Sequence, residues 1–323
     1  MIDEAIECLR RTRPSVLGAY TASMVPSERG PEGTMASEMV KVYDLLLFGA
    51  AANYDIQDGA DRIRSTKDLA LLFFRALEVF QPDLFVEAGA KDGGSSRRAR
   101  RRLKGARIVA FEANPYTYDR FRERNEKADI EYVHLAVSDK PGSVTFNVRM
   151  SPDGKPVADG RGALTKRADY EHGYMEVSVS STSLDVFFAG DEFKECALWM
   201  DVEGAAQQLF EGAANVLSRT AIAMVEVEDH SFWPGGWLSF DVVRHLHEAG
   251  LVPVARDFQA KYQYNIVFVR EPLLNNDRFR WFLAKYHSEG GRKIDGNEGV
   301  EDASGPVARS RLWLQRKLAR SHS

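Results

Sequence analysis

The chain has 323 residues, a net charge of −4, 44% hydrophobic residues and 28% charged residues. This length can bury a large core, in one sizeable domain or two modest ones, and the composition is ordinary for a soluble globular protein. The slightly negative net charge excludes a global basic surface, so nucleic acid is not an expected partner.

The two cysteines, Cys8 and Cys196, are too few for a disulfide framework, and no Cys-x-x-Cys pair is present to hold zinc. The N-terminus lacks the basic region and apolar stretch of a signal peptide. The longest apolar runs, 44–54 and 69–80, are shorter than the roughly 20 residues that a bilayer span requires. We therefore expect a protein of the reducing cytoplasm with no membrane span.

The N-terminal quarter of the chain is expected to be helical. Residues 1–80 are predicted as a helical segment with breaks at 26–33 and 58–59. Apolar residues recur every three or four positions over 69–80, which indicates an amphipathic helix. Ser65 or Thr66 is placed to cap the N-terminus of that helix.

Strands and helices alternate after this segment. Short apolar runs predict strands over 84–86, 107–111, 130–137, 197–202, 221–227, 251–255 and 266–269. Helical patterns cover 97–103, 115–127, 205–217 and 240–249. This alternation indicates βαβ units and a mostly parallel sheet.

Two stretches interrupt or follow the alternation. Residues 143–148 have the pattern of an antiparallel strand, and 151–174 form a Gly-, Asp- and Lys-rich loop whose length suggests a lid or disorder. A helix over 275–286 and a polar linker precede the basic residues 307–320, a solvated or partner-packed tail for which a membrane surface is the alternative. The expected domains are 1–80 (N-terminal helical segment), 81–272 (main domain) and 273–323 (C-terminal helix, linker and tail).

A glycine-rich turn follows the first predicted strand. It contains Gly89 and Gly93, and glycine lets the backbone turn with positive φ and lets a ligand approach closely. Such a turn in an open α/β sheet is where nucleotide-like ligands bind. The turn has neither the Gly-x-Gly-x-x-Gly of dinucleotide sites nor a Gly-x-x-x-x-Gly-Lys-Ser/Thr motif. A ligand held through a diphosphate is therefore not expected.

Glu112 ends the next strand. A carboxylate at this position can accept hydrogen bonds from both hydroxyls of a ribose. A nucleoside without a diphosphate points to S-adenosylmethionine. The alternative is structural: Gly89 and Gly93 then only close a tight turn, and Glu112 is a solvated strand end.

Several segments resemble the FkbM-type methyltransferases over about residues 83–269. They are Glu87-Ala-Gly-Ala-Lys-Asp-Gly, Phe111-Glu112-Ala-Asn114-Pro115, Ala136-Val137-Ser138-Asp139, Ser183-Leu184-Asp185 and, most specifically, Met200-Asp201-Val202-Glu203-Gly204-Ala205 with Phe210-Glu211-Gly212-Ala213 after it. The resemblance implies a Rossmann-like class I methyltransferase: an α/β fold with a mostly parallel seven-stranded sheet, helices on both faces, extra N-terminal helices and a C-terminal tail. It also implies S-adenosylmethionine as methyl donor and, usually, O-methyl transfer to a hydroxyl of a sugar or natural product.

The resemblance assigns cofactor-binding roles by position. The residues concerned are Glu87, Gly89, Ala90, Lys91, Asp92, Gly93, Glu112, Asn114, Val137, Ser138 and Asp201. Glu87, Gly89 and Gly93 would shape the methionine pocket, and Glu112 would hold the ribose with Asn114 beside it. Val137 and Ser138 would lie near the adenine. The chain departs from the family at two positions, since Asp is frequent where Glu87 stands and Asn where Lys91 stands.

The acceptor hydroxyl must lose its proton, and its pKa is about 15–16, like that of water. A positioned base then typically contributes about 10²–10⁴-fold in rate. Asp201 is the first candidate for this acceptor-site carboxylate and Glu203 the second, both at the end of a central strand. In the alternative interpretation both carboxylates only cap the following helix.

Metal is not part of the expected site. The alternative is a magnesium or calcium site formed by Asp201 with the acidic segment 226–229, since hard cations bind carboxylates. His172 and His230 are weaker candidates for a base. Aromatic residues over 232–237 suit either the apolar face of a sugar ring or a loop pinned to the core.

The expected partner is a small-molecule or glycan acceptor, and pairing of the N-terminal helices into a homo-oligomer stays open. Two other functions remain as alternatives. One is an NAD(P)-dependent oxidoreductase, against which the missing dinucleotide motif argues. The other is a non-catalytic Rossmann-like binding module. N-methyl transfer is a variant of the methyltransferase hypothesis.

Overall fold

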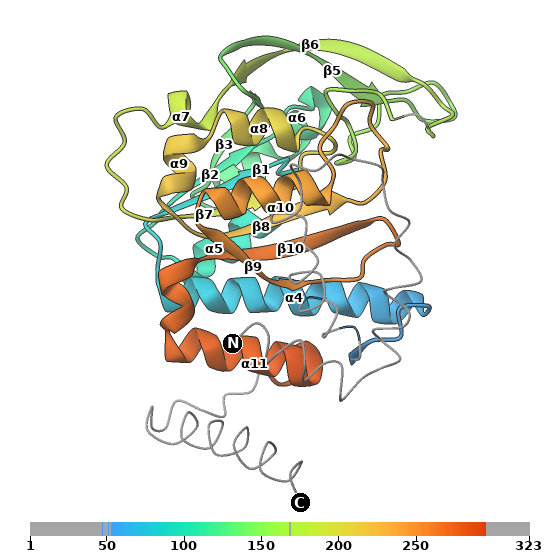
Figure 1. Ribbon diagram of the computed structural model, residues 1–323. Coiled ribbons are helices and arrows are strands. Elements are labelled where there is room, and N and C mark those ends of the chain that lie inside the picture. The colour runs from blue at the N-terminus through green and yellow to red at the C-terminus, as the bar shows by residue number, and fades with distance from the viewer. Residues whose placement is uncertain (1–46, 48–50, 52, 168, 295–323) are drawn as a thin grey trace, which may run out of the picture.

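The computed structural model describes residues 47, 51, 53–167 and 169–294 (Figure 1). The predictions for 1–46 and for the basic tail after residue 294 lie outside the described residues. The helices are α4 (Gly59–Phe80), α5 (Gly94–Arg102), α6 (Pro115–Glu126), α7 (Leu184–Phe187), α8 (Ala206–Glu211), α9 (Ala214–Ser218), α10 (Ser239–Glu248), η3 (Glu271–Asn275), α11 (Asp277–Glu289) and η4 (Gly290–Lys293). The strands are β1 (Leu84–Ala88), β2 (Arg107–Phe111), β3 (Glu131–Val133), β4 (Ala136–Val137), β5 (Gly142–Arg149), β6 (Tyr174–Thr182), β7 (Cys196–Met200), β8 (Thr220–Glu228), β9 (Leu251–Arg256) and β10 (Gln263–Arg270).

The main sheet has seven strands in the order β3-β2-β1-β7-β8-β10-β9. All neighbouring pairs are parallel except those of β10, which runs antiparallel to both β8 and β9. The strand order reverses between β1 and β7, and ligands of open α/β sheets bind outside the carboxyl ends of the strands at such a point. The predicted mostly parallel seven-stranded sheet is confirmed.

Helices cover both faces of this sheet (Figure 1). On one face α4 lies between the strands and α11, and Phe73 and Phe74 of α4 pack with α5 and the strands in one buried cluster. Trp199 of β7 lies with its ring centroid 5.3 Å from that of Phe73 and 5.5 Å from that of Phe74. On the other face α7, α8, α9 and α10 bury Leu209 and Leu246, among others, in a second cluster. The sheet is therefore buried on both faces, as parallel sheets are.

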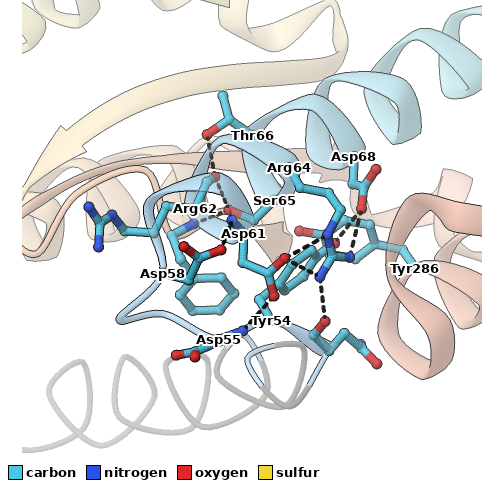
Figure 2. Close-up of polar contacts among 12 residues, drawn as sticks. Tyr54, Asp55, Asp58, Asp61, Arg62, Arg64, Ser65, Thr66, Asp68 and Tyr286 are labelled. Atoms are coloured by element: carbon cyan, nitrogen blue, oxygen red, sulfur yellow. Dashed lines mark hydrogen bonds and ion pairs between the residues drawn. The ribbon is translucent and has the colours of Figure 1, made fainter.

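Helix α4 begins earlier than predicted. Its N-cap is Asp58, whose side chain accepts the N–H of Asp61 at 3.1 Å (Figure 2). The predicted break at 58–59 is confirmed, but the predicted cap at Ser65 or Thr66 is wrong. Both hydroxyls donate to the carbonyl of Arg62 inside the helix, at 2.7 and 3.3 Å. Serine and threonine thus satisfy their hydroxyls on the preceding turn without ending the helix.

Three further predictions need correction. The run 130–137 divides between two sheets, because β3 joins the main sheet and β4 joins a second sheet of order β4-β6-β5. The helix predicted over 205–217 is broken into α8 and α9 at Gly212, where a Cβ would lie 2.5 Å from the carbonyl oxygen of Ser138. Strand β6 was not predicted; it pairs with the predicted antiparallel strand at 143–148, part of β5.

The predicted long loop connects β5 to β6 and lies against β5 and the first turn of α6. The Asn114 side chain donates to the carbonyl of Val157 at 3.2 Å. The Thr117 hydroxyl donates to the carbonyl of Asp159 at 3.4 Å, and Asn147 exchanges backbone hydrogen bonds with Ala163. We call residues 150–173 the connector. Its described part is held by hydrogen bonds to α6 and β5.

Candidate active site

The carboxyl ends of β1, β2 and β7 lie side by side, because Ala88 is in register with both Phe111 and Met200. The residue after each of these strands is a predicted site residue: Gly89, Glu112 and Asp201. The sheet therefore brings the three sequence motifs to one edge, where the connector covers them.

Gly89 makes the turn after β1 possible. Its φ is +77°, and a Cβ on it would lie 1.8 Å from the carbonyl oxygen of Asp201. Its N–H and that of Ala90 donate to the carbonyl of Phe111, at 3.1 and 2.9 Å. Because only glycine has no Cβ, only glycine allows the first turn to pass this close to the end of β7.

Gly93 ends the same turn and is the N-cap of α5. Its φ is +70°, and a Cβ would lie 2.4 Å from Oδ1 of Asn125 on α6. Lys91, between the two glycines, also has positive φ, at 49°. The turn is therefore held in a conformation that side chains rarely adopt.

Glu112 is 5% exposed, and both of its carboxylate oxygens accept backbone hydrogen bonds. Oε2 accepts the N–H of Lys91 and Oε1 that of Asn114, each at 2.7 Å. Each oxygen keeps a second lone pair, so both can accept one hydroxyl more. Burial raises the pKa of Glu112 to about 7. The pair of free lone pairs matches the two hydroxyls of a ribose.

A narrow cavity of about 50 Å³ opens beside Glu112. Gly89, Phe111, Val137 and Val202 line it, and Gly162 of the connector closes it. Phe111, Val137 and Val202 give it an apolar wall, and Glu112, Asp159 and Asp201 give it an acidic one. An adenosine presents an apolar base and a polar ribose, which suits a cavity with both kinds of wall. The predicted neighbour Val137 lines this cavity. Ser138 is buried next to it, and its hydroxyl donates to Asp139 at 3.0 Å.

Other predicted cofactor residues have side chains engaged elsewhere. Glu87 accepts hydrogen bonds from the N–H of Ser96 at 2.8 Å and from its hydroxyl at 2.5 Å, and burial raises its pKa to about 7. Asp92 forms an ion pair with Arg97 at 2.9 Å. Asn114 caps α6. None of these three lines either cavity described here, so their roles as direct ligands stay predictions.

Three carboxyl groups meet at the end of β7 and β8. One oxygen each of Asp201, Glu203 and Glu226 lie within 4.8 Å of one another. Asp201 and Glu226 share a hydrogen bond. Burial and the two neighbouring carboxylates raise the pKa of Glu226 well above its usual range, so Glu226 carries the proton and donates it to Asp201. Gln263 of β10 donates from Nε2 to Glu226 at 2.9 Å and to Glu203 at 3.5 Å.

Glu203 has a different environment. Burial and the charge of Asp201 raise its pKa to about 7, while the charges of Arg167 and Arg161 oppose this. Its one hydrogen bond among the described residues is the long contact with Gln263. At neutral pH Glu203 can therefore accept a proton and release it again.

The carboxyl cluster has part of the geometry that the alternative magnesium or calcium site requires. Asp201, Glu203 and Glu226 are close enough to share one cation, whereas Asp229 accepts a hydrogen bond from the Tyr264 hydroxyl at 2.9 Å. The hydrogen bond between Asp201 and Glu226 and the donation from Gln263 to Glu226 at 2.9 Å hold two of these carboxyl groups, whereas Glu203 keeps only the contact at 3.5 Å. The metal site stays an alternative prediction.

A second, wider cavity of about 530 Å³ adjoins the first and shares Gly89, Gly160 and Asp201 with it. The carboxyl cluster of Asp201, Glu203 and Glu226 lines one side of this cavity, which we call the floor. Cationic side chains line it as well: Lys91, Arg149, Arg161 and Arg167. Tyr170, Tyr174 and Trp233 add aromatic surface. The long loop, 151–174, for which a lid was one prediction, thus supplies two of the four cations, Arg161 and Arg167, and the aromatic rings of Tyr170 and Tyr174.

Sequence reasoning missed two of the groups that complete the site. Gln263 lies on β10, in register with Glu228, and its approach to the acids depends on antiparallel pairing that no local pattern marks. Arg161 stands in a stretch without periodicity. The aromatic segment 232–237 divides between both predicted roles, since Trp233 lines the wide cavity while Trp237 packs into the core beside His245.

These features fit S-adenosylmethionine. The turn at Gly89 is a cradle that a Cβ would fill, and Glu112 offers two free lone pairs beside a cavity with an apolar wall of Phe111, Val137 and Val202. The Rossmann-like sheet, the glycine turn and the acidic strand ends define a class I, S-adenosylmethionine-dependent methyltransferase. No described helix combines the length and apolar character needed to cross a bilayer.

Comparison with known proteins gives the family. Residues 87–253 match the model of the methyltransferase FkbM domain. The chain is 24% identical over 164 residues to the 2-O-methyltransferase NoeI of Sinorhizobium fredii, an alignment that covers 48% of this chain and 68% of that protein. The chain belongs to the FkbM methyltransferase family. A methyltransferase therefore replaces the two alternative functions, an NAD(P)-dependent oxidoreductase and a non-catalytic binding module.

Solved structures give more distant matches. The methyltransferase FkbM from Methylobacillus flagellatus is 13% identical, with a TM-score of 0.38 over 58% of this chain. The match covers 44% of that protein's length. A 1,6-didemethyltoxoflavin N1-methyltransferase from Burkholderia thailandensis, 12% identical, matches 76% of this chain and 93% of its own with a TM-score of 0.34.

Proposed function

We propose that the protein transfers a methyl group from S-adenosylmethionine to a hydroxyl of a sugar, a glycan or a natural product, with Glu203 as the base. The observation that carries the proposal is the placement of Glu203. Its pKa is raised to about 7, and it lies on the floor of the wide cavity beside the turn predicted to hold the cofactor. The 2-O-methyltransferase activity of the relative NoeI supports a hydroxyl as acceptor.

The cofactor would be held at Gly89 and Glu112, with its ribose at Glu112 and its adenine directed toward the narrow cavity. S-adenosylmethionine supplies a methyl group on a positively charged sulfur, which leaves as neutral S-adenosylhomocysteine. Because the carbon is already activated, the protein mainly has to align the acceptor oxygen with it.

Glu203 accepts the proton of the acceptor hydroxyl as the new oxygen–carbon bond forms. Asp201 and Glu226 position the base: their shared proton keeps the cluster from carrying three negative charges. The charge of Asp201 nevertheless raises the proton affinity of Glu203.

The first experiment is calorimetric titration with S-adenosylhomocysteine, with NADH as control ligand. The wild-type chain is expected to bind with a Kd of micromolar or tighter, about −8 kcal/mol. Glu112→Ala should weaken binding at least 10-fold, while Glu171→Ala, in the exposed part of the connector, should not.

The second step follows labelled methyl groups into monosaccharide and oligosaccharide acceptors and locates them by NMR. A methyl ether is the expected product. Methylation of amines alone, by a chain that binds S-adenosylhomocysteine, would overturn O-methyl transfer. Cytoplasmic location stays a prediction from the cysteine content.

A further inference from the structure

The lining of the wide cavity carries more positive charge than binding of a neutral sugar requires. Lys91, Arg149, Arg161 and Arg167 all line the cavity, three of them on or next to the connector. Two have carboxylate partners: Arg149 contacts Asp159 at 3.4 Å, and Arg167 contacts Asp169 at 2.6 Å. The two others, Lys91 and Arg161, form no ion pair within the described part of the chain.

Arg161 is the most exposed of the three arginines that line the cavity, and its charge acts on Glu203. Its charge lowers the pKa of Glu203, as that of Arg167 does. Lys91 acts in the same way on Asp201. These cations are therefore near the carboxyl cluster, within the same cavity and not on a remote surface.

Arginine side chains here are also positioned by aromatic rings. The guanidinium carbon of Arg149 lies 3.8 Å from the centroid of the Tyr170 ring, and that of Arg167 lies 4.0 Å from that of Phe232. Nε of Arg149 is buried without a hydrogen-bond partner in the described structure. An aromatic ring that stacks on a guanidinium group fixes the plane of that group. A guanidinium with a fixed plane can donate two parallel N–H groups to a carboxylate or a phosphate.

The acidic groups balance only part of this charge. Asp159 and Asp169 pair with two of the four cations, and Asp201 adds one negative charge on the floor. Burial raises the pKa of Glu226 well above its usual range, so that this carboxyl stays neutral. S-adenosylmethionine adds one net positive charge when it binds. An acceptor with a negative group would restore neutrality in a cavity where unpaired charge is costly.

We propose that the wide cavity binds an acceptor that carries an anionic group, a carboxylate or phosphate on the sugar, and that Arg161 is the residue that recognises it. The inference rests on the proposed O-methyl transfer for the position of the acceptor. The aromatic surface of Tyr170, Tyr174 and Trp233 receives the ring, and the guanidinium of Arg161 receives the anion. A carboxylate could also come from the methionine end of the cofactor, and the experiment separates these two sources.

The test compares p-nitrophenyl β-D-glucuronide with p-nitrophenyl β-D-glucoside, which differ in one carboxylate. Calorimetry is carried out on the full chain saturated with S-adenosylhomocysteine. We expect the glucuronide to bind at least about 10-fold more tightly, about 1.4 kcal/mol. Arg161→Ala should bring the ratio close to one, and Arg161→Lys should keep part of it. Lys155→Ala, which removes an exposed connector cation that does not line the cavity, should leave the ratio unchanged.

Equal binding of the two glycosides, or no binding of either, would overturn the proposal. Loss of S-adenosylhomocysteine affinity in Arg161→Ala with the glycoside ratio preserved would assign Arg161 to the cofactor and overturn it too. Failure of the proposed function looks different: the glucuronide then binds preferentially but receives no methyl group. Methyl transfer to both glycosides at equal kcat/KM would retain the function and remove the anion site.

Discussion

The Cα of Gly89 and the carbonyl oxygen of Asp201 lie so close that a Cβ on the glycine would come within 1.8 Å of that oxygen. This approach joins the first turn of the sheet to the end of β7. The two residues line both cavities, so the contact lies where the methyl group would pass from donor to acceptor.

Gly89→Ala tests this contact. The variant must relieve a clash with backbone and adopt a positive φ, and we expect S-adenosylhomocysteine binding to be lost in calorimetry. Gly154→Ala is the matched control, because Gly154 has a φ of +73° but nothing within 4 Å of its added Cβ. The control should lower the free energy of unfolding by about 1–2 kcal/mol from backbone strain alone. Equal effects of the two substitutions would contradict a role for the close approach.

The rate of methyl transfer should depend on the protonation of Glu203. Because the base must be ionised, kcat/KM is expected to rise with pH through about 7 and then level off. Glu203→Gln should lower kcat by about 10²–10⁴-fold and remove this rise, with little change in the Kd for S-adenosylhomocysteine. Glu171→Gln serves as the control. A pH profile that persists in Glu203→Gln would move the base to another residue.

Stability should fall as the pH rises. Glu87, Glu112 and Glu203 have pKa values of about 7 in the folded chain, and Glu228 one of about 8, against a usual value of 4.5. Between about pH 4.5 and pH 7–8 the folded state keeps protons that the unfolded state has released, so the free energy of unfolding decreases over this window. A shift of this size corresponds to on the order of 3 kcal/mol for one group.

Urea unfolding at several pH values measures that dependence. Glu228→Gln removes one of the titrating groups and should flatten the curve between pH 5 and pH 8, whereas Glu171→Gln should not. A wild-type curve that rises with pH over this range would contradict the buried state of these carboxyls.

Chelation distinguishes the two interpretations of the carboxyl cluster. If the proton shared by Asp201 and Glu226 and the amide of Gln263 satisfy the cluster, methyl transfer should survive EDTA and dialysis within about two-fold. Loss of activity that returns with Mg²⁺ or Ca²⁺ would instead make these three residues metal ligands.

The parts of the site that could be predicted from the sequence are those that the chain places locally. Gly89, Glu112 and Asp201 each follow a buried strand directly, and parallel strands bring their carboxyl ends to one edge. The same rule predicted the sheet itself. Short strands such as β4, with two residues, carry too little pattern to be separated from their neighbours.

The rest depends on pairing between distant segments. Gln263 reaches Glu226 across 37 positions, through the antiparallel register of β8 and β10. Arg161 and Arg167 of the wide cavity lie in a connector without periodicity. Hydrogen bonds from Asn114, Thr117 and Asn147 hold this connector in place. Such contacts are made by tertiary structure alone, and a single sequence does not show them.

The double role of Asn114 has a kinetic consequence. Its N–H donates to Glu112, and its side-chain amide holds the carbonyl of Val157 in the connector. A ribose that binds Glu112 therefore acts through Asn114 on the connector, which lines the wide cavity proposed for the acceptor. We expect the donor to enter before the acceptor, in a compulsory order that product-inhibition patterns would reveal: S-adenosylhomocysteine competitive against the donor and noncompetitive against the acceptor. Asn114→Ala should turn that sequence into a random one.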